Sequence, residues 1–138
     1  MAMNEHDDMK RKLLISCKTV AVVGLSDKPN RPSFRIASYL QNNGYRILPI
    51  NPNITEVLGE KAFPDLRAVP DKVDLVSVFR REGVTEIIKE AKEVGIPAVW
   101  VQPGIECNEE SVQKALESQI ELIKDACIMV DHNNLSRQ

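Results

Sequence analysis

The run from Lys18 to Gly24 (KTVAVVG) constrains the fold of this chain more than any other stretch of its sequence. The run is apolar and mostly β-branched without alternation, which is typical of a strand that is covered on both faces. Apolar residues then recur at helical spacing from Phe34 to Leu40, until Gly44 ends the pattern. A buried strand, a glycine turn and an amphipathic helix are typical of the start of a parallel α/β fold.

Strand and helix patterns alternate along the rest of the chain. Further strands are predicted over residues 45–50, 73–79, 96–102 and 120–123, and helices over residues 8–16, 84–94 and 108–118. A short helical turn is expected around residues 64–68, and a partly helical tail after residue 125. Asn108 is placed to cap its helix, with Glu109 and Glu110 in the first turn. This order predicts an α/β fold, a three-layer Rossmann-like domain whose five-stranded parallel sheet is flanked by helices.

Length and composition limit the classes of function. The 138 residues are expected to form one domain, residues 1–138, of which residues 1–8 are flexible. The formal net charge of −2 offers no positive field for nucleic acid or for an anionic membrane surface. The start of the chain lacks the apolar segment of a signal peptide, and no run approaches the roughly 20 residues of a membrane span. Cys17, Cys107 and Cys127 form no CxxC pair, which favours free thiols in a cytoplasmic protein.

The segment between the first strand and its helix, GLSDKPNRPS, has the features of an anion site. Ligands of such sheets bind beyond the carboxyl ends of the strands, where the strand order reverses. Gly24 permits a tight turn, Ser26 offers a hydroxyl, and a helix start capped by Ser33 or Asn30 presents free N–H groups. Positive charge is supplied by Lys28, Arg31 and Arg35. The alternative is a long capped turn whose basic side chains are only solvated.

The loop does not match the glycine pattern of dinucleotide sites. GxGxxG is reduced to Gly24, with Ser26 at the second glycine position. The acidic residue that would hold the ribose hydroxyls of NAD is expected at the end of the second strand, where this chain has Asn51. NAD is therefore disfavoured, whereas a ligand with a phosphate on its adenosine ribose remains possible. The Walker pattern is absent too, so nucleotide hydrolysis has no support.

Taken together, these residues resemble the small single-domain CoA-binding proteins, which are similar to the CoA-binding domain of the succinyl-CoA synthetase α subunit. The resemblance runs from about Thr19 to Leu135 and rests on the order and spacing of six segments: VAVVGLSDKPNRPSFRIASYL, GYRILPINPN, LGEKAFPDL, VDLVSVFRR, VWVQPGI and KDACIMVDHNNL. It implies that coenzyme A or an acyl-CoA binds as a small-molecule ligand across the carboxyl edge of the sheet. It leaves the identity of any protein partner open.

The resemblance also assigns residues to the parts of the ligand. The diphosphate would be lined by Gly24, Leu25, Ser26 and Arg31, with Lys28 adding charge nearby and Ser33 at the helix start beneath it. Adenine and its ribose would be flanked by Pro49, Asn51, Pro52 and Asn53. The wall of the groove would be formed by Val78, Phe79 and Arg80. The pantetheine arm would face Gln102, Pro103, Gly104 and Ile105. Arg80 would add charge for a phosphate, or it is only a solvated residue at a strand end.

Two departures from the synthetase pattern bear on catalysis. The catalytic histidine has no counterpart, since His6 and His132 lie near the ends of the chain, and the nucleotide-grasp domain is absent. Non-catalytic binding of CoA, as a carrier, sensor or storage protein, is therefore the leading hypothesis. The alternatives are a subunit of an acyl-CoA-processing enzyme whose catalytic domain is a separate chain, and an NAD(P)-binding redox protein. A transcriptional regulator would require a helix-turn-helix, for which no segment is spare.

Two other features have a functional and a structural interpretation. Cys107 precedes the helix capped by Asn108, whose N-terminus would lower the pKa of the thiol, so a mixed disulfide with CoA is one hypothesis and a small loop residue the other. His6, Asp7 and Asp8 are adjacent along a terminal stretch and lack the spacing of metal ligands, so no metal site is expected.

Overall fold

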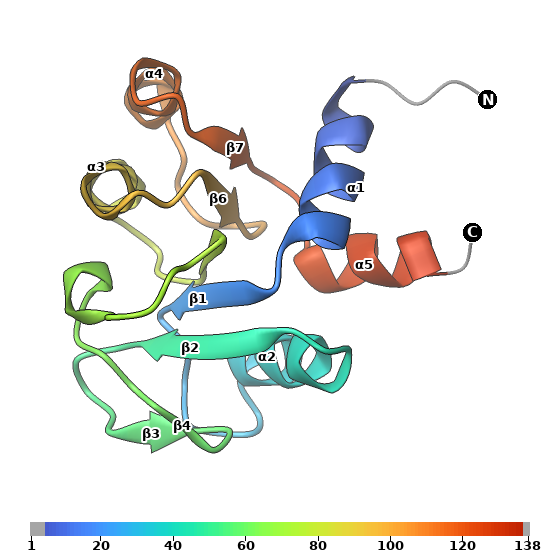
Figure 1. Cartoon of the computed structure of the whole chain (residues 1–138), viewed down its shortest axis with the longest axis vertical. Coiled ribbons are helices and arrows are strands. Elements are labelled where there is room, and N and C mark those ends of the chain that lie inside the picture. The colour runs from blue at the N-terminus through green and yellow to red at the C-terminus, as the bar shows by residue number, and fades with distance from the viewer. Residues whose placement is uncertain (1–4, 137–138) are drawn as a thin grey trace.

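The computed structural model describes residues 5–136, and a sheet of five parallel strands lies at their centre (Figure 1). The strands are β1 (Thr19–Val23), β2 (Arg46–Ile50), β5 (Leu75–Val78), β6 (Ala98–Val101) and β7 (Glu121–Ile123). Their order across the sheet is β2-β1-β5-β6-β7, and every neighbouring pair is parallel. The predicted α/β fold with a five-stranded parallel sheet is confirmed.

Helices cover both faces of this sheet. One face is covered by α1 (Glu5–Ser16), α2 (Pro32–Asn42) and α5 (Ile128–Ser136), and the other by α3 (Val84–Val94) and α4 (Glu109–Glu117). Because successive strand residues point to opposite faces, Val20 and Val22 belong to the first core, whereas Ala21 and Val23 belong to the second. Burial on both faces explains why the strands read as uninterrupted apolar runs.

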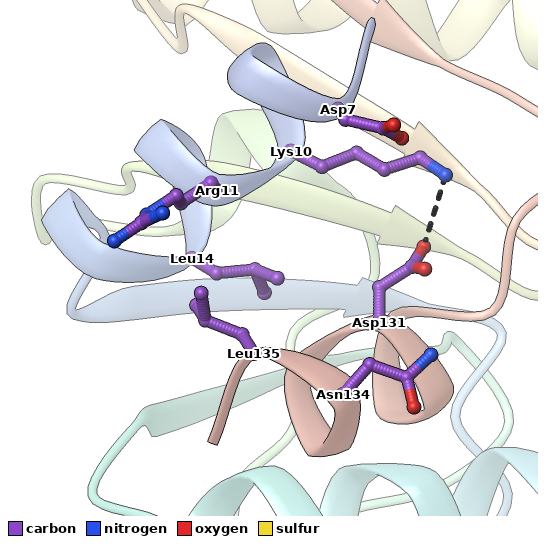
Figure 2. A pocket seen from close by; sticks show the side chains of 7 residues that line it. All are labelled: Asp7, Lys10, Arg11, Leu14, Asp131, Asn134 and Leu135. Carbon is purple, nitrogen blue, oxygen red and sulfur yellow. Dashed lines mark ion pairs between the residues drawn. The ribbon is translucent and has the colours of Figure 1, made fainter. Parts of the chain in front are cut away.

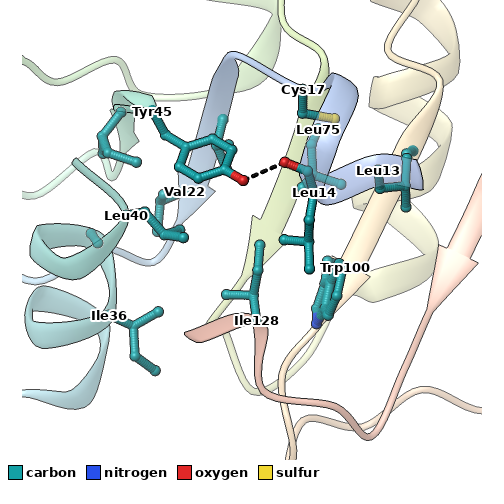
Figure 3. Close-up of a cluster of buried hydrophobic side chains, with 14 of the residues drawn as sticks. Leu13, Leu14, Cys17, Val22, Ile36, Leu40, Tyr45, Leu75, Trp100 and Ile128 are labelled. Atoms are coloured by element: carbon teal, nitrogen blue, oxygen red, sulfur yellow. Dashed lines mark hydrogen bonds between the residues drawn. The ribbon is translucent and has the colours of Figure 1, made fainter. Parts of the chain in front are cut away.

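The core under α1, α2 and α5 also satisfies the polar ends of its aromatic residues (Figure 3). Trp100 is fully buried, and its Nε1–H donates to the carbonyl oxygen of Ala126 at 2.9 Å. The hydroxyl of Tyr45 donates to the carbonyl oxygen of Leu14. Because an unpartnered buried donor is costly, these bonds favour one packing of α1 and of the segment before α5 against the sheet.

The structure differs from the sequence prediction between β2 and β5. A two-residue turn at Leu58 and Gly59, with φ of 55° and 77°, joins the short antiparallel strands β3 (Glu56–Val57) and β4 (Glu60–Lys61). The sequence suggested only a loose stretch there. The short turn predicted around residues 64–68 is confirmed as the 3₁₀ helix η1 (Leu66–Ala68).

The first helix begins earlier than predicted. Helix α1 starts at Glu5 rather than at residue 8, and residues 1–4 of the stretch predicted to be flexible lie outside the described residues. No helix in the described part of the chain combines the length and the apolar character that crossing a membrane requires.

The crossovers place a topological switch point between β1 and β5. After β1 the chain passes through α2 to β2 over one face, whereas after β5 it passes through α3 to β6 over the other face. The loops that follow β1 and β5 therefore diverge at the carboxyl edge of the sheet. This is the position at which open α/β sheets bind their ligands.

Candidate functional site

A cleft of about 460 Å³ lies where the loops after β1 and β5 diverge. Both loops and the first turn of α2 line it, with Gly24, Ser26, Lys28, Arg31, Pro32, Ser33, Phe79 and Arg81. Its volume falls within the range of about 300–1,000 Å³ that is typical of small-molecule sites. Loop residues predicted from the sequence therefore share one cavity with Phe79, which follows β5.

The cleft is surrounded by positive charge. Lys28, Arg31 and Arg81 are exposed, and no ion pair joins any of them to a carboxylate within residues 5–136. Asp27, the one acidic residue of the loop GLSDKPNRPS, is exposed and does not line the cleft. An anionic ligand can therefore pair with these cations without displacing an internal partner.

The first turn of α2 is left open toward the cleft. Arg31 is the N-cap residue, no side chain caps the helix, and Pro32 occupies its first position. The predicted capping by Ser33 or Asn30 is wrong, because the Ser33 hydroxyl oxygen instead accepts the N–H of Ser26 at 3.0 Å. The N–H groups at the start of a helix carry partial positive charge, and without a cap they are available to a bound anion.

Both its backbone conformation and its packing favour glycine at position 24. Its φ is +87°, and a Cβ at this position would lie 3.1 Å from the backbone nitrogen of Arg80 and 3.3 Å from the carbonyl carbon of Phe79. The loops after β1 and β5 therefore approach each other so closely that a side chain at position 24 would have to push the backbone of the neighbouring loop away, in addition to adopting an unfavourable φ. The residue shapes the floor of the cleft through this contact.

The two adjacent arginines after β5 point to different cavities. Arg81 lines the cleft, whereas Arg80 lines a cavity of about 60 Å³ together with Asp65, Glu86 and Glu90. The Arg80 guanidinium also lies next to Gly83. The sequence singled out Arg80 and missed Arg81, although the alternation of side chains along an extended segment places Phe79 and Arg81 on the same side.

Among the predicted residues at the end of β2, Asn51 contacts the loop after β1, and none of them lines the cleft. The Asn51 side chain donates from Nδ2 to the carbonyl oxygen of Leu25 at 3.0 Å and accepts the N–H of Asn53 at Oδ1 at 2.9 Å. Pro49 is buried, and Pro52 and Asn53 are exposed. The structure thus places Asn51 against the predicted phosphate loop, and its contact with a ribose stays a prediction.

Besides Ser33 and Pro49, the residues Leu25, Val78 and Gln102 were predicted to line the ligand and are buried, and none of these three lines the cleft. Leu25 and Val78 are fully buried, one in each core. Gln102 is 3% exposed, and its amide donates to the Ser77 hydroxyl at 3.3 Å and accepts the N–H of Ile128 at 3.4 Å. These contacts tie the edge of the sheet to α5 and leave the Gln102 amide little access to a ligand.

The rest of the segment predicted to face the pantetheine arm lies nearer the surface. Pro103 and Gly104 are exposed, and Ile105 packs partly against the core under α3 and α4. None of them lines the cleft between the loops. Their role in binding a pantetheine arm stays a prediction.

The environment of Cys107 does not favour the reactive thiol that the sequence suggested. Burial raises the pKa of the Cys107 thiol, with nearby Lys124 opposing and Asp125 reinforcing the shift, so the predicted lowering by the helix N-terminus is wrong. Burial, reinforced by Asp74, raises the pKa of Cys17 to about 11. Thiolates are therefore scarce at neutral pH at both positions, which disfavours the mixed disulfide between Cys107 and CoA.

The histidines give no catalytic group to the cleft among the described side chains. His132 lies in α5, where its Nδ1 is 2.8 Å from the Tyr39 hydroxyl and its ring packs edge-on against Tyr39 and Tyr45. The side chain of His6 lies outside the described part, so the set of His6, Asp7 and Asp8 is not placed. Among the described residues, no group of three His, Cys, Asp or Glu side chains is arranged to hold a metal ion.

Two proteins that are similar to this chain match it over nearly their whole length, one by sequence and one by structure. The uncharacterized protein YneT of Bacillus subtilis is 41% identical over 123 residues, which are 88% of this chain and 90% of that protein. A hypothetical protein from Pyrococcus horikoshii OT3 superposes with a TM-score of 0.89 at 31% identity, covering 99% of this chain and 98% of its own.

One relative that is much longer than this chain is named as an enzyme. Acetate–CoA ligase (ADP-forming) II of Archaeoglobus fulgidus is 36% identical over 91 residues, which are 63% of this chain but only 14% of the ligase. The family model described as CoA binding domain matches residues 18–133. The chain therefore belongs to the CoA-binding domain family.

Proposed function

We propose that the cleft binds the diphosphate of coenzyme A or of an acyl-CoA, and that the chain catalyses no reaction by itself. The observation that supports this most is the uncapped start of α2 facing a cleft lined by Lys28, Arg31 and Arg81, which form no ion pair with any carboxylate in the described part of the chain. A diphosphate matches such a site because helix N–H groups and guanidinium groups both bind phosphate oxygens.

The same cleft offers little that would select a nicotinamide dinucleotide. The residue after β2 is Asn51, whose amide is engaged by backbone groups, and the carboxylate that holds ribose hydroxyls in NAD sites is absent at that position. Members of this family are described by CoA binding, which agrees with a ligand that carries an extra phosphate on its ribose. NAD(P)-linked redox chemistry therefore has no support.

Absence of catalysis is proposed from the groups that the cleft contains. Its lining offers one aromatic residue and basic or small residues, and it contains no histidine or carboxylate that could act as a base toward Ser26 or Ser33, and no cysteine. A carrier, sensor or storage role is consistent with such a lining.

Ligand-dependent thermal stability tests this proposal. A ligand that binds the folded state raises the unfolding temperature by mass action, so saturating CoA should raise it more than dephospho-CoA, and both more than NAD or ATP. Equal shifts with CoA and NAD would contradict the proposal.

Two adjacent arginines provide a matched pair of variants. Arg81→Ala should weaken CoA binding about tenfold or more, the loss expected for one charge-assisted hydrogen bond. Arg80→Ala removes the same side chain from the neighbouring cavity and should leave CoA affinity within about twofold of wild type. A larger loss of CoA affinity in Arg80→Ala than in Arg81→Ala would indicate that the diphosphate binds in the cavity lined by Arg80.

A second candidate function is a CoA-binding subunit of an ADP-forming ligase. It is favoured by the similarity to the α subunit of acetate–CoA ligase (ADP-forming) II of Pyrococcus furiosus, 27% identical over 130 residues and matched over 28% of that subunit. The purified chain with acetyl-CoA, ADP and phosphate should release no ATP unless the remaining ligase domains are supplied as separate chains. ATP release by the chain alone would refute both candidates.

A further inference from the structure

The peptide group between Leu25 and Ser26 is held by a side chain at each end. Its carbonyl oxygen accepts the Asn51 Nδ2–H at 3.0 Å, and its N–H donates to the Ser33 Oγ at 3.0 Å. Asn51 follows β2 and Ser33 lies in the first turn of α2. Because a peptide group is planar, these two bonds together fix how the plane is turned.

Both side chains are themselves fixed. Asn51 Oδ1 accepts the N–H of Asn53 at 2.9 Å, so the amide must present its nitrogen to Leu25. Ser33 is 6% exposed, and the Leu25 side chain beside the peptide is fully buried. Ser26, which contributes the N–H of this peptide, and Ser33, which accepts it, both line the cleft, so the peptide lies at the cleft wall.

We infer that Asn51 and Ser33 are positioning residues that lock this peptide and so keep the cleft attractive to a diphosphate; the inference rests on the proposed binding of CoA. The locked N–H points toward the start of α2. If the peptide turned over, the carbonyl oxygen of Leu25 would point there instead. Its partial negative charge would then lie beside the N–H groups of α2 and oppose an anion.

The lock explains why two polar residues of this site do not point freely into the cleft. Ser33 is the second residue of α2, and Arg31 at the N-cap position makes no capping bond, so the first N–H groups of the helix are not consumed by a cap. The Ser33 hydroxyl holds the loop by accepting the N–H of Ser26, while the start of α2 stays open. Asn51, expected beside the adenosine ribose, holds the other side of the same peptide.

Amide hydrogen exchange on the full chain without ligand tests the lock itself. In Ser33→Ala the Ser26 amide loses its acceptor and should exchange about tenfold faster or more, while the amides of β1 keep their rates. Ser33→Thr retains a hydroxyl oxygen and should restore slow exchange. Ser38→Ala changes a serine of the same helix outside the cleft and serves as the control. Unchanged exchange at Ser26 in Ser33→Ala would overturn the lock.

A double-mutant cycle on CoA affinity, measured by titration calorimetry, tests its role in binding. Ser33→Ala and Asn51→Ala should each weaken CoA binding about 2- to 12-fold, with the dependence on salt unchanged because Lys28, Arg31 and Arg81 remain. Since both side chains act on one peptide, the double variant should lose less than the product of the two single losses. Losses that multiply would mean that each residue contacts the ligand independently, which would overturn the inference.

The outcomes separate this inference from the proposed function. If the wild-type chain does not bind CoA, the proposed function fails, and with it the role assigned to the lock, whatever the exchange experiment shows. If CoA binds to wild type and to both single variants with equal affinity, CoA binding stands and only the inference falls.

Discussion

Helices α2 and α4 both begin at the carboxyl edge of the sheet, yet their N-termini are built in opposite ways. In α4 the Asn108 side chain caps the helix by accepting the N–H of Ser111 at 3.0 Å, and Glu109 and Glu110 occupy the first turn. The adjoining cavity of about 250 Å³ is lined by further carboxylates, those of Glu82, Glu86 and Glu106. In α2 there is no cap and no acidic residue in the first turn, and basic side chains surround the cleft.

From this difference we expect side chains, and not the fold, to decide which helix start receives an anion. Both helices present the same partial positive charge at their first N–H groups. In α4 that charge is already satisfied by the protein. In α2 it is unsatisfied and reinforced, and this is the condition under which a phosphate ligand gains most from binding.

The loops that precede the two helices differ in how closely they are packed, and glycine variants should show it. Gly24 and Gly104 both have positive φ, of 87° and 83°, but a Cβ at Gly24 would lie 3.1 Å from a backbone atom and one at Gly104 would contact nothing within 4 Å. Gly24→Ala should therefore lower the free energy of unfolding by roughly 1–3 kcal/mol more than Gly104→Ala. Chemical denaturation measures both, and equal losses would show that the close approach of the loops is unimportant.

Removing the cap of α4 should affect stability alone. Asn108→Ala loses the bond to the Ser111 N–H and should lower the free energy of unfolding by about 1 kcal/mol, with CoA affinity unchanged. Arg31→Ala, at the corresponding position of α2, removes no capping bond and should change stability by less than about 0.5 kcal/mol. Equal losses of stability in Asn108→Ala and Arg31→Ala would contradict the difference in capping between α4 and α2.

The weakest effect that we expect is on the pH dependence of stability, and it arises from His132 in α5, away from both helix starts. Burial lowers the pKa of His132 below its ordinary value of 6.5. The unfolded chain then binds the proton more readily, so the stabilisation is complete above pH about 6.5 and is lost as the pH falls toward the folded-state pKa. Thermal unfolding followed from pH 7 to pH 5 should show this decline, and His132→Gln should remove part of it. An unchanged pH profile in the variant would assign the decline to other groups.

The fold was predictable because its signals are local. Uninterrupted apolar runs and helical stripes identified the parallel sheet and its helices, and Asn108 was correctly predicted as a cap. The hairpin of β3 and β4 was missed because its turn places Leu58 in a left-handed conformation, where asparagine or aspartate is the usual signal.

The details of the site depend on contacts between residues that are distant in the sequence, which local sequence patterns do not reveal. Ser33 was expected to cap its own helix, but it bonds to Ser26 seven residues earlier. Gln102 was expected to face a ligand, but it is buried by Ser77 and Ile128, which are 25 and 26 residues away in the sequence. Arg81, in contrast, was accessible to sequence reasoning through strand alternation.

If the open start of α2 is the anion site, as we propose, closing it with a new cap in Arg31→Asn should impair binding. The backbone of Arg31 is extended, with φ of −86° and ψ of 143°, so an asparagine there can cap α2 much as Asn108 caps α4. We expect Arg31→Asn to raise the free energy of unfolding without ligand by about 0.5–1 kcal/mol and to weaken CoA binding more than Arg31→Ala does, because the new cap occupies the N–H groups of the helix. A more stable variant that still binds CoA like Arg31→Ala, or like wild type, would contradict the claim.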